Sequence, residues 1–217
     1  MAIIVVGDRT KRFRGEVGAD GIRTKFMVDD RHDGDNIDHL NPWFCELTGL
    51  YYMWKHDNDD IVGLEHYRRY LSADGRTPIN MFDIRNRLAQ SDMICSMVNY
   101  ESSPILSYFI NRGKDFCIWM MKYLEWLKVL WPEFGEYCHR YVEGHQHILG
   151  NIFISRKQLL DEYASFLFKS LMGFYECELK HGRQVYPRIM GYLSEFLFGA
   201  WTSFVGKNVT AVKICWN

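Results

Sequence analysis

Short apolar runs alternate with longer segments of helical periodicity along this chain. Six runs have the length and composition of buried strands: 3–6, 25–28, 61–64, 92–96, 151–154 and 209–214. Apolar residues recur at helical spacing in five further regions: 42–56, 80–90, 108–141 with breaks at Gly113 and Pro132, 157–175 and 187–204. Strands that alternate with helices predict an α/β fold. Because neither a repeat nor a linker interrupts the pattern, we expect one domain over 1–217, with a mainly parallel central sheet flanked by helices.

Composition narrows the class of protein. The chain has 217 residues and 47% hydrophobic content, which is enough for a sizeable core. Its formal net charge of −1 gives no global basic field for nucleic acid or an anionic membrane. Its six cysteines are spread singly, without a C-x-x-C pair, which favours reduced thiols over a disulfide framework or a zinc site. No signal peptide or membrane-length apolar run is visible, so we expect a cytoplasmic protein.

A charged segment begins abruptly where the apolar strand 61–64 ends. Glu65 and His66 follow Leu64 directly, and Tyr67, Arg68 and Arg69 come next. A core strand does not tolerate so much unpaired charge, so this segment is expected at the rim of a ligand site. In an extended chain, neighbouring side chains point to opposite faces, so at most one of the two arginines is expected beside His66. A solvated strand end with mutually paired charges is the alternative.

The loop after the first strand carries no phosphate-binding signature. Gly7-Asp8 closes the strand without G-x-G-x-x-G or a P-loop, which disfavours dinucleotide and P-loop sites. The basic residues at 9–14 could meet a diphosphate or simply form a solvated loop.

Two further clusters are candidates for ligand contact. The acidic turn 33–36 contains Asp35 and Asn36, which either bind ligand or cap the helix that follows. Arg188 and Glu195 lie seven residues apart, so a helix from Pro187 presents them on one face with Tyr192. That face could combine an anion binder with a general base, or form a surface ion-pair ladder.

Several segments, taken together, resemble a known family. The specific ones are Asp-Gly-Asp-Asn-Ile at 33–37, Asn-Pro at 41–42, Cys-Glu-Leu-Thr at 45–48, Trp-Lys at 54–55 and Gly-Leu-x-His-Tyr-Arg-Arg-Tyr at 63–70. Weaker ones are 150–154 and 188–195, so nearly the whole chain is covered. The sequence is similar to a bacterial and phage family that is usually labelled a domain of unknown function and is attached to capsular and exopolysaccharide glycosyltransferases.

The resemblance implies a GT-A-like fold that transfers a sugar from a nucleotide donor, expected to be UDP-linked, to a saccharide hydroxyl. Two alternatives remain: a phage enzyme that transfers glucose or arabinose to a hydroxymethylated pyrimidine in DNA, and a non-catalytic nucleotide-sugar-binding module. Members commonly carry His-Lys where this chain has Gly7-Asp8. The usual metal-binding Asp-x-Asp is replaced by Glu65-His66-Tyr67, and Arg68 or Arg69 could neutralise the diphosphate instead. We therefore expect no required metal, with Mg²⁺ or Mn²⁺ as the alternative.

These arguments assign the site residues. Three are candidates for the catalytic base: Glu65, His66 and Glu195. The first two rank ahead because their strand also carries the arginines expected to bind phosphate. Eight are assigned to donor binding: Gly7, Asp35, Asn36, Tyr67, Arg68, Arg69, Asn151 and Arg188. No residue is assigned to a metal.

Overall fold

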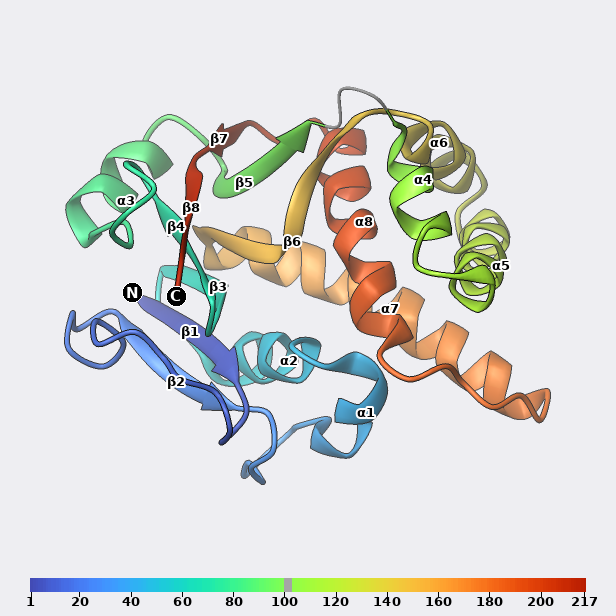
Figure 1. The fold of residues 1–217 in the computed structure, drawn as a ribbon, viewed down its shortest axis with the longest axis horizontal. Coiled ribbons are helices and arrows are strands. Elements are labelled where there is room, and N and C mark those ends of the chain that lie inside the picture. Colours follow the sequence, from blue (N-terminus) through green and yellow to red (C-terminus); the bar gives the residue numbers. More distant parts are fainter. Residues whose placement is uncertain (100–102) are drawn as a thin grey trace.

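The computed structural model describes residues 1–99 and 103–217, and one mixed sheet runs through them (Figure 1). The described residues form eight strands: β1 (Ala2–Gly7), β2 (Arg23–Met27), β3 (Ile61–His66), β4 (Arg69–Ser72), β5 (Met93–Asn99), β6 (Gln146–Arg156), β7 (Val209–Ala211) and β8 (Lys213–Trp216). Their order is β2-β1-β3-β6-β5-β7, and β4 branches from β3 to pair with β8. In the described part of the chain, six strands run in one direction, while β4 and β6 run in the other. This confirms the predicted α/β class, and most of the described strands share one direction, as expected of a mainly parallel sheet.

Helices cover the two faces of the sheet unequally. The described residues form these helices: the 3₁₀ helix η1 (Asp38–Leu40), α1 (Asn41–Phe44), α2 (Leu47–His56), α3 (Met81–Leu88), α4 (Ile105–Ile110), α5 (Lys114–Leu130), α6 (Pro132–Val142), α7 (Lys157–Lys180) and α8 (Ile189–Phe204). Helices α2, α7 and α8 pack directly on one face, and α4, α5 and α6 form a further layer beside α7 and α8 (Figure 1). Helix α3 covers part of the other face.

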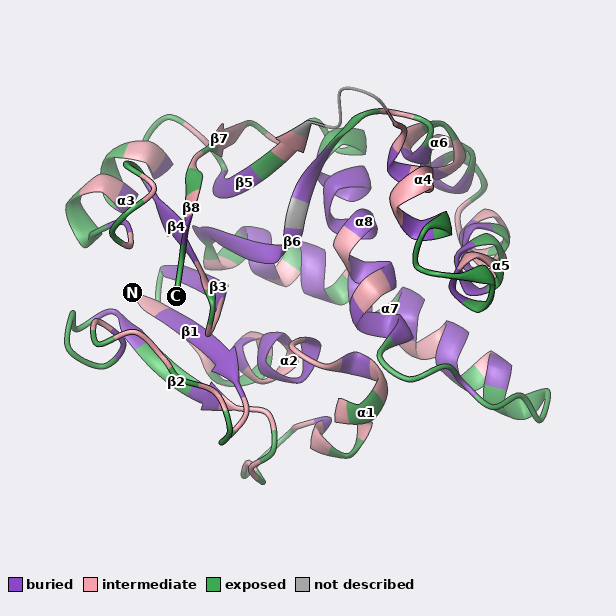
Figure 2. Ribbon diagram, viewed as in Figure 1, coloured by how far each residue is buried: buried purple, intermediate pink, exposed green. Residues whose placement is uncertain are grey.

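The two cores follow from the alternation of side chains along the strands. Ile4 and Val62 face the large helical layer, whereas their neighbours Ile3 and Ile61 face α3. Figure 2 shows the central strands and the inner faces of α2, α7 and α8 as largely buried. Asn80 accepts a hydrogen bond from the backbone N–H of Asp83, which caps the start of α3.

Three predicted elements differ from the structure. The expected helix 42–56 is broken between α1 and α2, because Cys45 adopts a φ of 51°. The expected final strand 209–214 is two strands, β7 and β8, which pair with different partners. The expected strand 151–154 extends over 146–156. In the described part of the chain, no helix combines the length and apolarity needed to cross a bilayer.

Candidate active site

A cleft opens where the parallel strands β1 and β3 end. One cavity of about 200 Å³, the arginine pocket, is lined by Cys45, Glu46, His66, Arg68, Arg69, Tyr108, Arg112, Arg188, Gly191, Tyr192 and Glu195. A neighbouring cavity of about 360 Å³, the strand-end pocket, is lined by Val6, Gly7, Asp8, Lys11, Val28, Asn41, Pro42, Cys45, Glu46, His66, Tyr67, Arg68 and Arg188. The cavities share five residues and so form one cleft. This edge is where open α/β sheets bind ligands.

The turn between β3 and β4 delivers both arginines to the arginine pocket. Strand β3 ends at His66, the chain reverses at Tyr67 and Arg68, and β4 starts at Arg69, which pairs with His66. The expectation that only one arginine would lie beside His66 is therefore wrong, because the segment is a tight reversal and not a continuous strand. Gly150 has a φ of 65°, and a Cβ there would lie 3.2 Å from the Arg69 guanidinium, so glycine gives this side chain room over β6.

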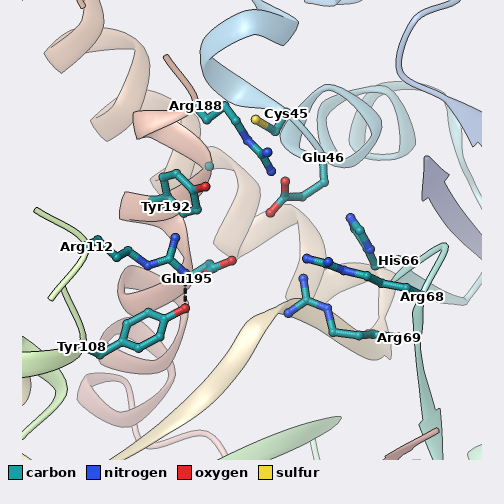
Figure 3. Close-up of a pocket in the computed structure, with 11 residues that line it drawn as sticks. Cys45, Glu46, His66, Arg68, Arg69, Tyr108, Arg112, Arg188, Tyr192 and Glu195 are labelled. Atoms are coloured by element: carbon teal, nitrogen blue, oxygen red, sulfur yellow. Dashed lines mark hydrogen bonds between the residues drawn. The ribbon is translucent and has the colours of Figure 1, made fainter. Parts of the chain in front are cut away.

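Four guanidinium groups face the same space without carboxylate partners. Figure 3 shows Arg68, Arg69, Arg112 and Arg188 turned toward the centre of the arginine pocket. Within the described residues, none of them has a carboxylate oxygen within 4.0 Å. The Nε atom of Arg69 is buried and has no hydrogen-bond partner among those residues. Buried donors are normally satisfied, so this arrangement favours an anionic ligand.

His66 is held neutral by its surroundings. Burial lowers its pKa to about 3, and the charges of Arg69, Arg68 and Arg188 contribute to the shift. Its ring stacks at a tilt against Tyr67, with centroids 4.5 Å apart. A neutral imidazole can donate or accept a hydrogen bond at pH 7, but a conjugate acid with so low a pKa makes it a weak base.

The break between α1 and α2 brings Glu46 into the cleft. Cys45 has a positive φ, which turns the chain at this point. The side chains of Cys45 and Glu46 both line the arginine pocket as a result. Glu46 accepts a hydrogen bond of 2.8 Å from the side-chain amide of Asn151. Helix α8 passes close to this turn at Gly191, where a Cβ would be in ordinary van der Waals contact, 3.4 Å from the Cys45 Cβ and 3.6 Å from a Glu46 carboxylate oxygen.

Helix α8 forms the opposite wall. Arg188 precedes its first turn with a φ of 63°, and its backbone N–H donates to the carbonyl of Pro42. Arg188, Tyr192 and Glu195 all line the arginine pocket, so the structure brings together the three residues that the spacing grouped, although only Tyr192 and Glu195 belong to α8. Figure 3 shows the carboxyl groups of Glu195 and Glu46 directed into the same space from opposite sides.

The pKa of Glu195 is raised by its surroundings. Burial raises its pKa to about 7, and the nearby charge of Glu46 adds to the shift. The guanidinium groups of Arg69, Arg112 and Arg188 oppose it. A carboxyl group with a pKa near the working pH is matched to proton transfer, as catalytic carboxyls often are.

Glu65 does not reach the cleft. It lies on the opposite face of β3, fully buried, and its carboxylate accepts from Arg23 Nε at 2.7 Å and from the backbone N–H of Leu71 at 2.9 Å. Arg23 is buried as well and also bonds Asp20 and the carbonyl of Ile79. The geometry therefore does not favour Glu65 as the base of this cleft, because its carboxylate is enclosed in an ion pair outside both pockets.

Three predicted donor-binding residues also lie outside both pockets. The carboxylate of Asp35 accepts from the Tyr51 hydroxyl at 3.0 Å. The Asn36 amide donates to the carbonyls of His32 and Gly34, so this turn organises its own backbone. Asn151 is buried behind Glu46 and positions it. By contrast, Gly7 and Tyr67 line the strand-end pocket.

Sequence reasoning missed four residues of the arginine pocket: Cys45, Glu46, Tyr108 and Arg112. Glu46 gave a signal, since a carboxylate among aromatic residues needs a partner. Tyr108 and Arg112 gave none, because only the packing of the helical layer brings them to the sheet.

The arginine pocket offers few protein ligands for a divalent cation. Two carboxylates line the arginine pocket, and both face guanidinium groups. Over residues 1–99 and 103–217, no group of three or more His, Cys, Asp or Glu side chains is placed to hold a metal ion. Mg²⁺ in proteins usually binds through one or two carboxylates together with substrate phosphates, and in this pocket four guanidinium groups already supply positive charge.

Residues 4–207 match the family described as a domain of unknown function (DUF4422), and the chain belongs to it. The fold is similar to the apo structure of WbbM, a bifunctional glycosyltransferase, with a TM-score of 0.77 and 20% sequence identity. That match covers 100% of this chain and 45% of WbbM, so the chain spans less than half the length of that protein. No curated protein matches the sequence.

Proposed function

We propose that this protein is a glycosyltransferase that moves a sugar from a nucleotide-sugar donor to an acceptor hydroxyl. The observation that carries the proposal is the pairing, in one cleft, of unpaired arginines with a carboxyl group whose pKa is raised to about 7. Such a cleft can neutralise a leaving diphosphate on one side and accept a proton on the other. The fold shared with a glycosyltransferase supports this reading.

The donor is proposed to lie across both pockets. Its nucleoside occupies the strand-end pocket, beside Gly7 and Tyr67. Its diphosphate lies at the junction, where Arg68 and Arg188 line both cavities, and Arg69 completes the set from the arginine pocket. Guanidinium groups bind phosphate oxygens in planar, two-point contacts, which suits a diphosphate. UDP-linked sugars are the first donors to test.

Glu195 is the proposed base. It takes the proton of the acceptor hydroxyl as that oxygen bonds the anomeric carbon. The bond from the anomeric carbon to the diphosphate oxygen breaks, and its electron pair leaves with the diphosphate. Arg68, Arg69 and Arg188 offset the departing charge, so no metal is required in this scheme. His66, being neutral, serves as a hydrogen-bonding group.

The test has two stages. A thermal-shift screen against UDP, GDP, CMP and dTDP sugars should show one donor that raises the melting midpoint, because only the folded protein binds it. Release of nucleoside diphosphate is then followed with that donor. Glu195→Gln should still bind the donor but lose turnover, whereas the surface variant Glu162→Gln should keep it. If no nucleotide sugar shifts the midpoint, the proposal fails; if Glu195→Gln keeps turnover, the assignment of the base fails.

The same measurements distinguish a non-catalytic binding module from an enzyme. As a binding module, the wild type and both variants, Glu195→Gln and Glu162→Gln, would bind the donor, and none of them would release nucleoside diphosphate. No observation on the described residues favours DNA as acceptor.

A further inference from the structure

Arg112 lies on the side of the cleft away from the proposed donor. It lines the arginine pocket but not the strand-end pocket, whereas Arg68 and Arg188 line both. It comes from the short connection between α4 and α5, at the rim of the pocket, and its side chain is directed inward (Figure 3). A diphosphate at the junction of the two pockets would therefore contact Arg68 and Arg188, and not Arg112.

Aromatic rings hold this guanidinium in place. Its Cζ atom lies 4.3 Å from the ring centroid of Tyr192 and 4.6 Å from that of Tyr108, and it donates a hydrogen bond to the Tyr108 hydroxyl. A third ring, Phe116, lies 5.7 Å away. Rings fix the plane of a guanidinium without neutralising its charge.

Arg112 forms no ion pair with a carboxylate among the described residues. Within the described residues no carboxylate oxygen lies within 4.0 Å of it. Burial lowers the pKa of Arg112, but the hydrogen bond with Tyr108, and to a smaller extent the charge of Glu195, raise it overall. A fixed, unpaired guanidinium beside the proposed base is placed to receive an anionic group on the molecule that presents the reacting hydroxyl.

We propose that the acceptor is an anionic saccharide, whose carboxylate or phosphate binds Arg112 while its hydroxyl faces Glu195. This inference rests on the proposed glycosyl transfer. Because both residues line a single cavity of about 200 Å³, the anionic group lies on the reacting sugar unit or on the next one.

The test compares how tightly the protein, with UDP bound, binds matched anionic and neutral acceptor sugars. Methyl glycosides of glucuronic and galacturonic acid are set against methyl glucoside and galactoside, with glucose 6-phosphate to separate phosphate from carboxylate. Binding is measured by ligand-observed NMR in the presence of UDP. Wild-type protein should bind an anionic probe about tenfold more tightly than its neutral counterpart, which is the effect of one charge-assisted contact.

Substitution of Arg112 then locates the effect. Arg112→Gln should bind the anionic and neutral probes equally, Arg112→Lys should keep part of the preference, and UDP affinity should stay unchanged in both. Arg140→Gln removes a guanidinium from the exposed face of α6, outside both pockets, and should behave as wild type.

Three results would overturn the inference: no preference for either anionic group in the wild type, no binding of any anionic probe, or a preference that survives Arg112→Gln. A role for Arg112 confined to tuning Glu195 would instead shift the pH profile and lower turnover equally for neutral and anionic acceptors. Failure of the proposed glycosyl transfer can be distinguished from failure of this inference, because in that case no nucleotide or nucleotide sugar would bind the wild type or any variant.

Discussion

The buried pair of Glu65 and Arg23 should be a structural anchor, and Glu65→Gln tests this directly. Both side chains are almost fully buried, at 0% and 2% exposure. The substitution keeps the shape of the side chain but leaves the buried guanidinium without its main countercharge. Removing one partner of a buried pair costs about 3–5 kcal/mol. Since Asp20 still accepts from Arg23 at 2.7 Å, we expect a loss near the lower end, about 3 kcal/mol of the free energy of unfolding.

Urea unfolding followed by tryptophan fluorescence measures the loss. The control is Glu162→Gln, which breaks the surface pair with Lys207 and should change the free energy of unfolding by about 1 kcal/mol or less. Because natural domains are stable by roughly 5–15 kcal/mol, Glu65→Gln should remain folded without denaturant. If it does not, the double variant Arg23→Met with Glu65→Leu removes both charges and should recover much of the stability.

The same variant separates structure from catalysis. Folded Glu65→Gln should retain turnover, because its carboxylate reaches neither pocket. An unfolding free energy equal to that of the wild type, combined with lost turnover, would refute this reasoning and return Glu65 to the list of bases.

Other substitutions test the cleft. Arg68→Ala or Arg69→Ala should lower turnover by about a hundredfold, since one donor to a developing charge is worth roughly 3 kcal/mol, with little change in melting midpoint; equal losses of both would indicate a structural role. The raised pKa of Glu195, about 7 against an ordinary 4.5, means that the folded state retains a proton that the unfolded state loses between these values, so wild-type stability falls as the pH rises from about 4.5 to about 7 and stays lowered above that. Glu195→Gln should therefore be more stable than wild type at pH 8, by at most about 3 kcal/mol, and the gain should vanish near pH 4; wild-type kcat/KM should rise to a plateau above about pH 7, which a flat profile would contradict. Asn151→Leu removes the amide that holds Glu46 and should lower turnover about tenfold at unchanged donor affinity, as a lost buried hydrogen bond of about 1.4 kcal/mol would do.

Local patterns predicted the fold and the place of the cleft. Buried strands showed as short apolar runs, and the switch from Leu64 to charged residues marked the sheet edge where the pockets lie. Helical spacing predicted that Arg188 and Glu195 would lie together, and both line the arginine pocket, but only Glu195 belongs to α8, because Arg188 precedes the helix with a φ of 63°.

Features that depend on distant contacts or unusual backbone were not predictable. Arg23, the partner of Glu65, lies 42 residues away, so the sequence could not show that this carboxylate was already paired. Cys45 adopts a positive φ, which is rare for residues other than glycine. No local sequence signal predicted this break between α1 and α2, which brings Glu46 into the cleft. Arg112 enters the cleft only through packing between the helical layer and the sheet.

Holding several arginines close together has a consequence for the proposed reaction. Their charges also act on His66, whose pKa is lowered mainly by burial and further by the three guanidinium groups of Arg69, Arg68 and Arg188. A bound diphosphate would offset these charges, so donor binding should raise the pKa of His66. The arginines also restrain the pKa of Glu195, so a donor that offsets their charge would raise it further: the carboxylate would be a stronger base, but a larger share of it would already carry a proton at pH 7. In this arrangement the proton affinity of the proposed base depends on occupancy of the donor pocket, so the pH at which Glu195 can accept a proton should differ between the free protein and its donor complex.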